Sequence, residues 1–266
     1  MTARLENKIA IITGATSGIG EAAARRFAEE GATLMLAARS VDKGEALAAE
    51  LGDKVAFMRT DVSNENDMAA LIDATVERFG RLDCLFNNAG AGERSTAETI
   101  DEASFDHFMR LLAGSVAFGI KHAARVMKTS GGGGIINNAS IAGHRLSQGG
   151  YLYSGAKAAA AHFTRIASVE LGEYGIRVNA ISPGAIATPI FWGGSARAQT
   201  LSDEENAAKL DKLTGNLAQA TPLPRSGYAV DIANAAVFLA SDEASFVNGH
   251  DLVVDGGRIQ MFNEKS

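Results

Sequence analysis

Hydrophobic and polar positions follow two alternating rhythms along this chain. Short apolar runs such as Lys8–Thr13 show no polar alternation, which is typical of a strand covered on both faces. Longer segments with helical spacing follow these runs, and several end at a glycine, as Glu21–Glu30 does at Gly31. Strands are predicted over residues 8–13, 33–38, 55–60, 82–87, 135–139, 177–182 and 252–254. Helices are predicted over residues 21–30, 42–51, 64–79, 101–127, 151–174, 202–219 and 231–240.

This alternation predicts an α/β fold: one Rossmann-type, doubly wound domain over residues 1–266, with a parallel sheet of about seven strands and helices on both faces. In such folds ligands bind at the carboxyl ends of the strands. Residues 183–227 interrupt the alternation of strands and helices and contain a single predicted polar helix. A connection that long is predicted to be a lid or wall of the substrate site.

Composition narrows the function classes. Hydrophobic residues make up 46% of the 266 and charged residues 21%, as in an ordinary globular protein. The net charge of −6 disfavours nucleic acid or an anionic membrane as the main partner. A single cysteine, Cys84, and five histidines without metal-ligand spacing predict no metal site. The polar N-terminus does not resemble a signal peptide, and no apolar run reaches the ~20 residues of a membrane span, so we expect a cytoplasmic protein.

A glycine-rich turn joins the first strand to the first helix. It runs from Thr13 to Gly20, and its glycines allow backbone N–H groups to face an anion at the helix N-terminus. A turn without a ligand is the alternative, but the position between strand and helix favours a phosphate site. The predicted contacts are Gly14, Ser17, Gly18, Ile19 and Gly20.

The ends of the next three strands predict the rest of a dinucleotide site. After the second strand stands Arg39 with no acidic residue beside it, and a guanidinium pairs well with a 2′-phosphate, so NADP is favoured over NAD. A solvated surface charge is the alternative for Arg39. Asp61 and Val62 follow the third strand, where a carboxylate can accept from the adenine amino group. Small residues after the fourth strand would let a ribose lie against the backbone; the candidates are Asn87, Ala89 and Gly90.

The helix that begins near Tyr151 carries a candidate catalytic pair. Tyr153 and Lys157 are four residues apart and share a helical face, where an ammonium stabilises phenolate and lowers the phenol pKa. Such a phenol is a usable acid or base near neutral pH. Ser140, just after the fifth strand, is placed to stabilise a developing alkoxide. An ordinary amphipathic pair is the alternative for the tyrosine and lysine.

Together with Pro183-Gly184 and Thr188, these motifs occur in order from about residue 5 to 257, and the chain resembles the classical short-chain dehydrogenase/reductase family. Lys121–Met127 and Leu171–Asn179 resemble its secoisolariciresinol- and borneol-type alcohol dehydrogenases. The resemblance implies hydride transfer between nicotinamide C4 and a carbinol or carbonyl carbon, and a homotetramer. It implies that Tyr153 is the general acid/base, Ser140 the oxyanion partner and Lys157 also a ligand of the nicotinamide ribose. It further implies that a segment after the sixth strand holds the nicotinamide end, through Pro183, Gly184, Ile186 and Thr188.

One position departs from the family pattern. Where the family usually has an asparagine that holds a water linking the lysine to solvent, this chain has Leu112. An isobutyl group neither donates nor accepts, so slower proton delivery or a rerouted water is expected.

The resemblance to borneol-type alcohol dehydrogenases implies a secondary alcohol or ketone that is apolar and cyclic. Leu146, Phe191 and Trp192 are available to contact such a substrate. His144 lines the pocket or is a solvated loop residue, and Tyr151, which has no lysine partner, is a pocket or packing residue. One rival function is a 3-ketoacyl-thioester reductase. A rival of another class is a nucleotide-binding regulator with little turnover.

Overall fold

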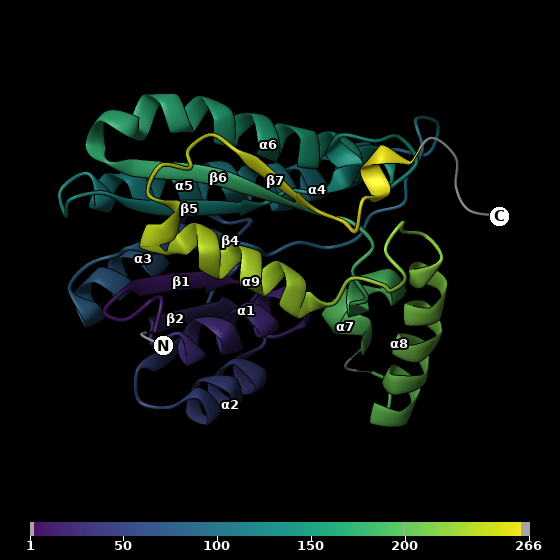
Figure 1. Cartoon of the computed structure of the whole chain (residues 1–266), viewed down its shortest axis with the longest axis horizontal. Coiled ribbons are helices and arrows are strands. Elements are labelled where there is room, and N and C mark those ends of the chain that lie inside the picture. Colours follow the sequence, from purple (N-terminus) through teal and green to yellow (C-terminus); the bar gives the residue numbers. More distant parts are fainter. Residues whose placement is uncertain (1–2, 199, 262–266) are drawn as a thin grey trace.

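All seven strands lie parallel in one sheet of order β3-β2-β1-β4-β5-β6-β7, in a computed structural model that describes residues 3–198 and 200–261 (Figure 1). The strands are β1 (Ile9–Thr13), β2 (Thr33–Ala38), β3 (Val55–Arg59), β4 (Cys84–Asn87), β5 (Gly133–Asn138), β6 (Ile176–Pro183) and β7 (Asp251–Val254). This arrangement confirms the predicted fold. The strand order reverses between β1 and β4, and open sheets of this kind bind ligands at such a switch point.

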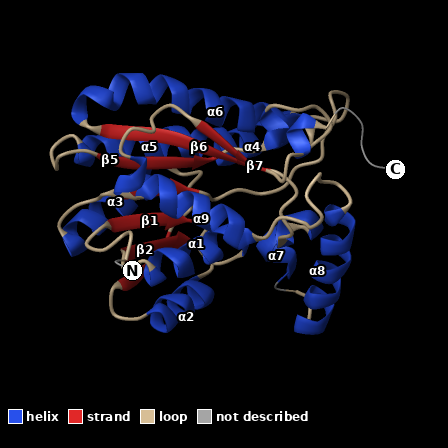
Figure 2. Cartoon of the chain, in the orientation of Figure 1, coloured by secondary structure: helices blue, strands red, loops and turns tan. Residues whose placement is uncertain are grey.

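Helices cover both faces of the sheet (Figure 2). On one face lie α1 (Gly18–Glu29), α2 (Val41–Leu51) and α9 (Ala229–Ala240). The other carries α3 (Glu65–Phe79), α5 (Ser115–Met127) and α6 (Tyr151–Leu171). Each interface is a fully buried apolar layer, with Ile12 and Phe27 in the first and Leu71 and Ile135 in the second. Strands buried on both faces explain why their sequences are apolar throughout.

The helix predicted over residues 101–127 is not continuous. It consists of α4 (Glu102–Met109), a π-helical turn (Arg110–Gly114) and α5. The N–H of Ser115 donates to the carbonyl of Arg110, five residues back, while its hydroxyl donates to the carbonyl of Leu111 at 2.6 Å. The hydroxyl thus takes the carbonyl that an α-helix would offer to the N–H. Turns of this kind are frequent at functional sites, and this one carries Leu112.

The segment 183–227 contains a 3₁₀ turn (Pro189–Trp192), α7 (Gly194–Ala198) and α8 (Asp203–Ala218). Ser202 and Glu205 form a reciprocal capping box that fixes the start of α8. Figure 1 shows α7 and α8 beyond the sheet, on the side toward which the strands point. Over the described residues 3–198 and 200–261, none of the helices has the length and apolar character needed to cross a membrane.

Candidate active site

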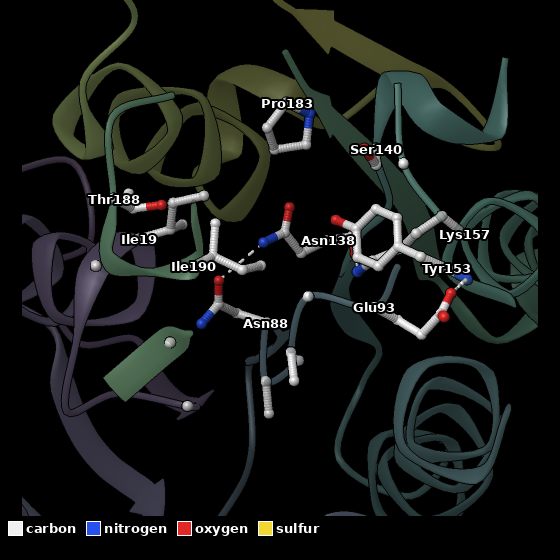
Figure 3. Close-up of a pocket in the computed structure, with 18 of the residues that line it drawn as sticks. Ile19, Asn88, Glu93, Asn138, Ser140, Tyr153, Lys157, Pro183, Thr188 and Ile190 are labelled. Carbon is white, nitrogen blue, oxygen red and sulfur yellow. Dashed lines mark hydrogen bonds between the residues drawn. The ribbon is translucent and has the colours of Figure 1, made fainter. Parts of the chain in front are cut away.

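A cavity of about 940 Å³ lies at the carboxyl ends of the strands (Figure 3). The loops after β1 to β6 supply most of its wall. The segment 183–227 closes another side with Ile190, Phe191 and Leu217. Its size is that of a site for a cofactor or a small-molecule ligand.

The loop after β1 brings the N-terminus of α1 to the cavity. Gly14 has φ +67°, and a Cβ there would lie 2.8 Å from the Cα of Ala89. A Cβ on Gly20 would lie 2.1 Å from the carbonyl oxygen of Gly14, so the turn closes only without side chains. Ser17 is the N-cap residue but makes no capping hydrogen bond. The first N–H groups of α1 are therefore available for an anion.

A side chain of β1 anchors the loop after β4. The Thr13 hydroxyl donates to the carbonyl of Phe86 at 3.3 Å and accepts from the backbone N–H groups of Asn88 (2.9 Å) and Ala89 (3.0 Å). The side-chain Nδ2 of Asn88 donates to the Thr13 carbonyl at 2.9 Å. The two strand ends on either side of the switch point are thus tied together, and the loop is held as a fixed wall of the cavity.

At the end of β2, Arg39 lines the cavity and is exposed. It has no hydrogen-bond or ion-pair partner among residues 3–198 and 200–261, so its guanidinium is available to a ligand. Asp61 lies nearby at the end of β3. The hydroxyl of Ser63 donates to its carboxylate at 2.7 Å and is the main cause of its lowered pKa, to which the charges of Arg39 and Arg59 add.

The three predicted catalytic side chains converge on the other end of the cavity (Figure 3). Ser140 follows β5, and Tyr153 and Lys157 lie one turn apart on α6. Ser140 is hydrogen-bonded to the Tyr153 hydroxyl. The ammonium of Lys157 donates to the carbonyl of Asn138 at 2.5 Å and lies 5.7 Å from the centre of the Tyr153 ring. The phenol and the hydroxyl can therefore contact one ligand atom together.

The pKa values of this group differ from the sequence expectation. Burial raises the pKa of Tyr153 above its ordinary value, and the hydrogen bond with Ser140 only partly opposes it, so the predicted lowering is wrong for the protein alone. Burial lowers the pKa of Lys157 to about 8. Desolvation thus outweighs the pairing of phenol and ammonium. The tyrosine is held as a neutral phenol, the form that donates a proton.

Glu93, which sequence reasoning missed, caps α6, the helix that carries Tyr153 and Lys157. The N-cap of α6 is Gly150, which has no side chain to offer, and a Cβ there would lie 2.5 Å from the Glu93 carboxylate. That carboxylate accepts from the N–H of Tyr153 at 3.0 Å and from the N–H groups of Leu152 and Ser95. Burial acts to raise the pKa of Glu93, but these hydrogen bonds outweigh it and the pKa is lowered. Glu93 is therefore ionised and fixes the first turn that carries Tyr153.

Comparison with known proteins matches this arrangement over nearly the whole chain. The profile of a family described as Enoyl-(Acyl carrier protein) reductase matches residues 14–258. Momilactone A synthase from Oryza sativa subsp. japonica is 41% identical, over 96% of this chain and 90% of that protein. Secoisolariciresinol dehydrogenase from Forsythia intermedia is 36% identical over 96% and 90%. The crystal structure of levodione reductase superposes with a TM-score of 0.84 at 35% identity, over 97% of this chain and 100% of that one.

The chain belongs to the short-chain dehydrogenase/reductase family. It is an NAD(P)-dependent oxidoreductase of alcohols and ketones, as the sequence resemblance predicted.

The cavity fits the nicotinamide dinucleotide that short-chain dehydrogenases/reductases use. The unsatisfied N–H groups of α1 suit the pyrophosphate, and Arg39 and Asp61 lie where the adenosine would be held. The predicted cofactor residues that line the cavity are Gly14, Ser17, Gly18, Ile19, Arg39, Asp61, Val62, Ala89, Gly90, Tyr153, Lys157, Pro183, Gly184, Ile186 and Thr188.

Two predicted cofactor residues lie outside the cavity wall and support it. Gly20 is where α1 presses against Gly14. Asn87 is buried, and its Nδ2 donates to Asn137 Oδ1 at 2.9 Å, behind the wall. Its amide oxygen also excludes any side chain at Gly119, where a Cβ would lie 2.2 Å from it. Both act as packing residues in this short-chain dehydrogenase/reductase.

Most of the residues predicted to contact the substrate do not line the cavity. Phe191 lines the cavity. Leu146 is 90% exposed and Tyr151 56% exposed, and neither lines it. His144 is turned away because its Nε2 lies 2.7 Å from the carboxylate of Asp251 in β7.

Trp192 faces the other side of its turn. Its Nε1 donates to Asn206 Oδ1 of α8 at 3.3 Å, and Trp192 lines a neighbouring cleft between α1 and α8, which adjoins the cavity at residues such as Ser17 and Thr188. The predicted apolar pair is thus divided, with Phe191 in the wall and Trp192 as an anchor for α8. The further cavity residues that sequence reasoning missed include Asn88, Glu93, Arg94, Leu111, Asn138, Gln148, Ile190, Leu217 and Arg258.

Leu112 lies close to Lys157, the predicted catalytic lysine. It is 1% exposed, and a Cβ built on Gly90 would lie 3.2 Å from its Cδ2 and 3.9 Å from the Lys157 ammonium. The point beside Gly90 is thus close to both the isobutyl group and the ammonium. Leu112 therefore places apolar surface near the charge of Lys157. Burial lowers the pKa of Lys157, and an apolar side chain near the ammonium is expected to add to that effect.

We expect Leu112→Asn to move the alkaline limb of the pH–rate profile to higher pH. An amide oxygen beside the ammonium favours the charged form and raises the pKa of Lys157 from about 8 toward its ordinary value. The lysine then keeps its charge at a pH where the wild-type lysine has lost it. Ketone reduction measured from neutral to alkaline pH gives the limb, with Leu112→Met as a control of similar volume. Superimposable profiles for Leu112→Asn and wild type would show that Leu112 does not set the charge of Lys157.

Proposed function

We propose that this enzyme uses NADP, in preference to NAD, to interconvert ketones and secondary alcohols on apolar, cyclic molecules. The observation that carries the proposal is the pairing of Ser140 and Tyr153 at one end of a cavity whose remaining wall holds Ile190, Phe191 and Leu217. Relatives named momilactone A synthase, secoisolariciresinol dehydrogenase and levodione reductase support it.

The chain's own groups account for the proton chemistry. When bound, the nicotinamide cofactor supplies or accepts the hydride. Ser140 donates a hydrogen bond to the carbonyl oxygen of the substrate and stabilises the charge that develops there. Tyr153 donates its proton to the same oxygen. Lys157 holds a positive charge near the phenol and would bind the nicotinamide ribose.

The raised pKa of Tyr153 favours one direction at neutral pH. A protonated phenol is ready to act as the acid in ketone reduction. Alcohol oxidation needs the phenolate, so oxidation is expected to gain rate as the pH rises while reduction does not.

The proposal is tested by titrating the protein with NADPH and NADH and then screening ketones. We expect tight NADPH binding, weaker NADH binding and NADPH oxidation with cyclic, apolar ketones. A panel should also hold acyclic ketones and 3-ketoacyl thioesters. Turnover of the thioesters alone would establish the ketoacyl-reductase alternative, and cofactor binding without any turnover would identify a nucleotide-binding regulator.

We also infer a homotetramer. Phe163, Ile166 and Val169 are exposed along α6, and Phe105 is exposed on α4. Such a row of apolar side chains on neighbouring helices favours burial against another copy. Sedimentation equilibrium measures the assembled mass against the 27.7 kDa of one chain.

A further inference from the structure

A chain of amide groups at the switch point fixes the orientation of Asn138. The carbonyl oxygen of Thr13 only accepts, so Asn88 must direct its Nδ2 toward it, at 2.9 Å. The Oδ1 of Asn88 is then left to accept, and it accepts from Nδ2 of Asn138 at 2.9 Å. Both amides are therefore locked, and Oδ1 of Asn138 points away from Asn88.

That oxygen is buried and unpaired. Asn138 is 8% exposed, and its Oδ1 has no hydrogen-bond donor among the residues that the structure describes. Asn138 nevertheless lines the cavity. An unpaired buried acceptor is costly, and at a cavity wall it is most simply explained by a ligand that satisfies it.

The surroundings of the oxygen indicate which part of a ligand it would meet. In Figure 3 the amide nitrogen of Asn138 faces Asn88 and its oxygen faces the side of Pro183. Pro183 begins the segment assigned to the nicotinamide end of the cofactor, and the backbone carbonyl of Asn138 holds the Lys157 ammonium at 2.5 Å. Asn138 thus lies between the proton-donating group and the segment that would hold the ring.

We propose that Oδ1 of Asn138 accepts from the nicotinamide group of NADP and binds its oxidised form more strongly than its reduced form. The inference rests on the proposed function. The nicotinamide ring carries a positive charge only when oxidised, and that charge polarises its carboxamide N–H and ring C–H groups. A fixed amide oxygen in a buried wall interacts more strongly with such charge-assisted donors than with neutral ones. Asn138 thereby favours hydride donation, because it stabilises the cofactor form that reduction produces.

The test is direct binding of both cofactor forms to Asn138→Leu, a substitution of similar volume that removes the acceptor. Dissociation constants for NADP⁺ and NADPH are measured by calorimetry, without substrate. We expect NADP⁺ to weaken about tenfold and NADPH about twofold or less, as for loss of a charge-assisted against a neutral hydrogen bond. Equal weakening of both forms would mean that the oxygen meets a ribose hydroxyl, which the two forms share, and would overturn the proposal.

Asn88→Ala is the matched control, because it breaks the same Asn88–Asn138 hydrogen bond and keeps the amide at 138. The substitution frees the amide at residue 138 but keeps its acceptor oxygen, so the NADP⁺ preference should fall by less than in Asn138→Leu. A fall as large as that of Asn138→Leu, or larger, would assign the effect to the amide network and overturn the proposal.

Asn138→Asp keeps an acceptor oxygen at the same place along the side chain and adds charge. It should shift the ratio toward NADP⁺, and this variant decides the question if Asn138→Leu does not fold. A shift toward NADPH would contradict the proposed role. Failure of the wild type to bind either cofactor would overturn the proposed function itself, whereas wild-type binding with an unchanged ratio in both variants overturns only the role of Asn138.

Discussion

Tyr153→Phe is expected to lower the turnover of ketone reduction by about a thousandfold, within the range by which a positioned general acid accelerates a reaction. The substitution removes one hydroxyl and leaves the ring, so the packing of α6 is kept. The hydroxyl that is removed is the group that interacts with Ser140. Cofactor affinity should change little, because most of the cofactor wall lies in the loops after β1 to β4.

The experiment measures kcat with a reducible ketone and the dissociation constant of NADPH on the same preparation. Ser140→Ala serves as a comparison, since it removes the oxyanion donor but keeps the acid. It should lose less than Tyr153→Phe, because the phenol still contacts the substrate oxygen. Ordinary turnover by Tyr153→Phe would remove Tyr153 from the reaction and direct attention to another proton donor in the wall.

The fold was predictable because its signals are local. Strands such as Ile9–Thr13 are apolar on both faces, and helices such as Glu65–Phe79 repeat at 3.6 residues and stop at a glycine. The phosphate loop was predictable for the same reason, since its glycines follow a strand directly. Each of these features depends on one element and the residues directly beside it in the sequence.

The wall of the substrate side was not predictable, because distant partners decide it. His144 lies four residues after Ser140, but its ring is hydrogen-bonded to Asp251, which lies more than a hundred residues further along the chain. Trp192 stands beside Phe191, yet Asn206 of α8 turns it to another surface. Motif spacing along the sequence gives no information about these two partners.

Two features of the catalytic end were hidden for a different reason. The π-helical turn depends on a serine hydroxyl taking the Leu111 carbonyl, an interaction that helix periodicity does not register. Glu93 caps α6 from a loop that lies sixty residues before Tyr153 in the chain. Helix-capping rules consider only the residues at the N-terminus of the helix itself, and the N-cap residue there is Gly150, which has no side chain to act as a cap.

Arg39→Asp is expected to exchange the cofactor preference, with NADPH binding weakened about a hundredfold and NADH binding improved. The arginine lines the cavity, has no partner among the described residues, and stands where other dinucleotide-binding folds place the residue that reads the 2′ position. The substitution removes a charge-assisted contact and adds repulsion of a 2′-phosphate, each worth about tenfold. The new carboxylate can instead accept from the 2′-hydroxyl of NADH.

Arg59→Asp is a closely matched control for this exchange. Arg59 ends β3, is exposed, and its charge acts on Asp61 as that of Arg39 does, but it does not line the cavity. The same change of charge at residue 59 alters the local field without touching the ligand. Fluorescence titration with NADPH and NADH should therefore show an unchanged preference for Arg59→Asp. If both variants shift the preference equally, the selectivity comes from the net charge around Asp61. A shift confined to Arg39→Asp establishes a direct contact, because only that side chain reaches the cavity.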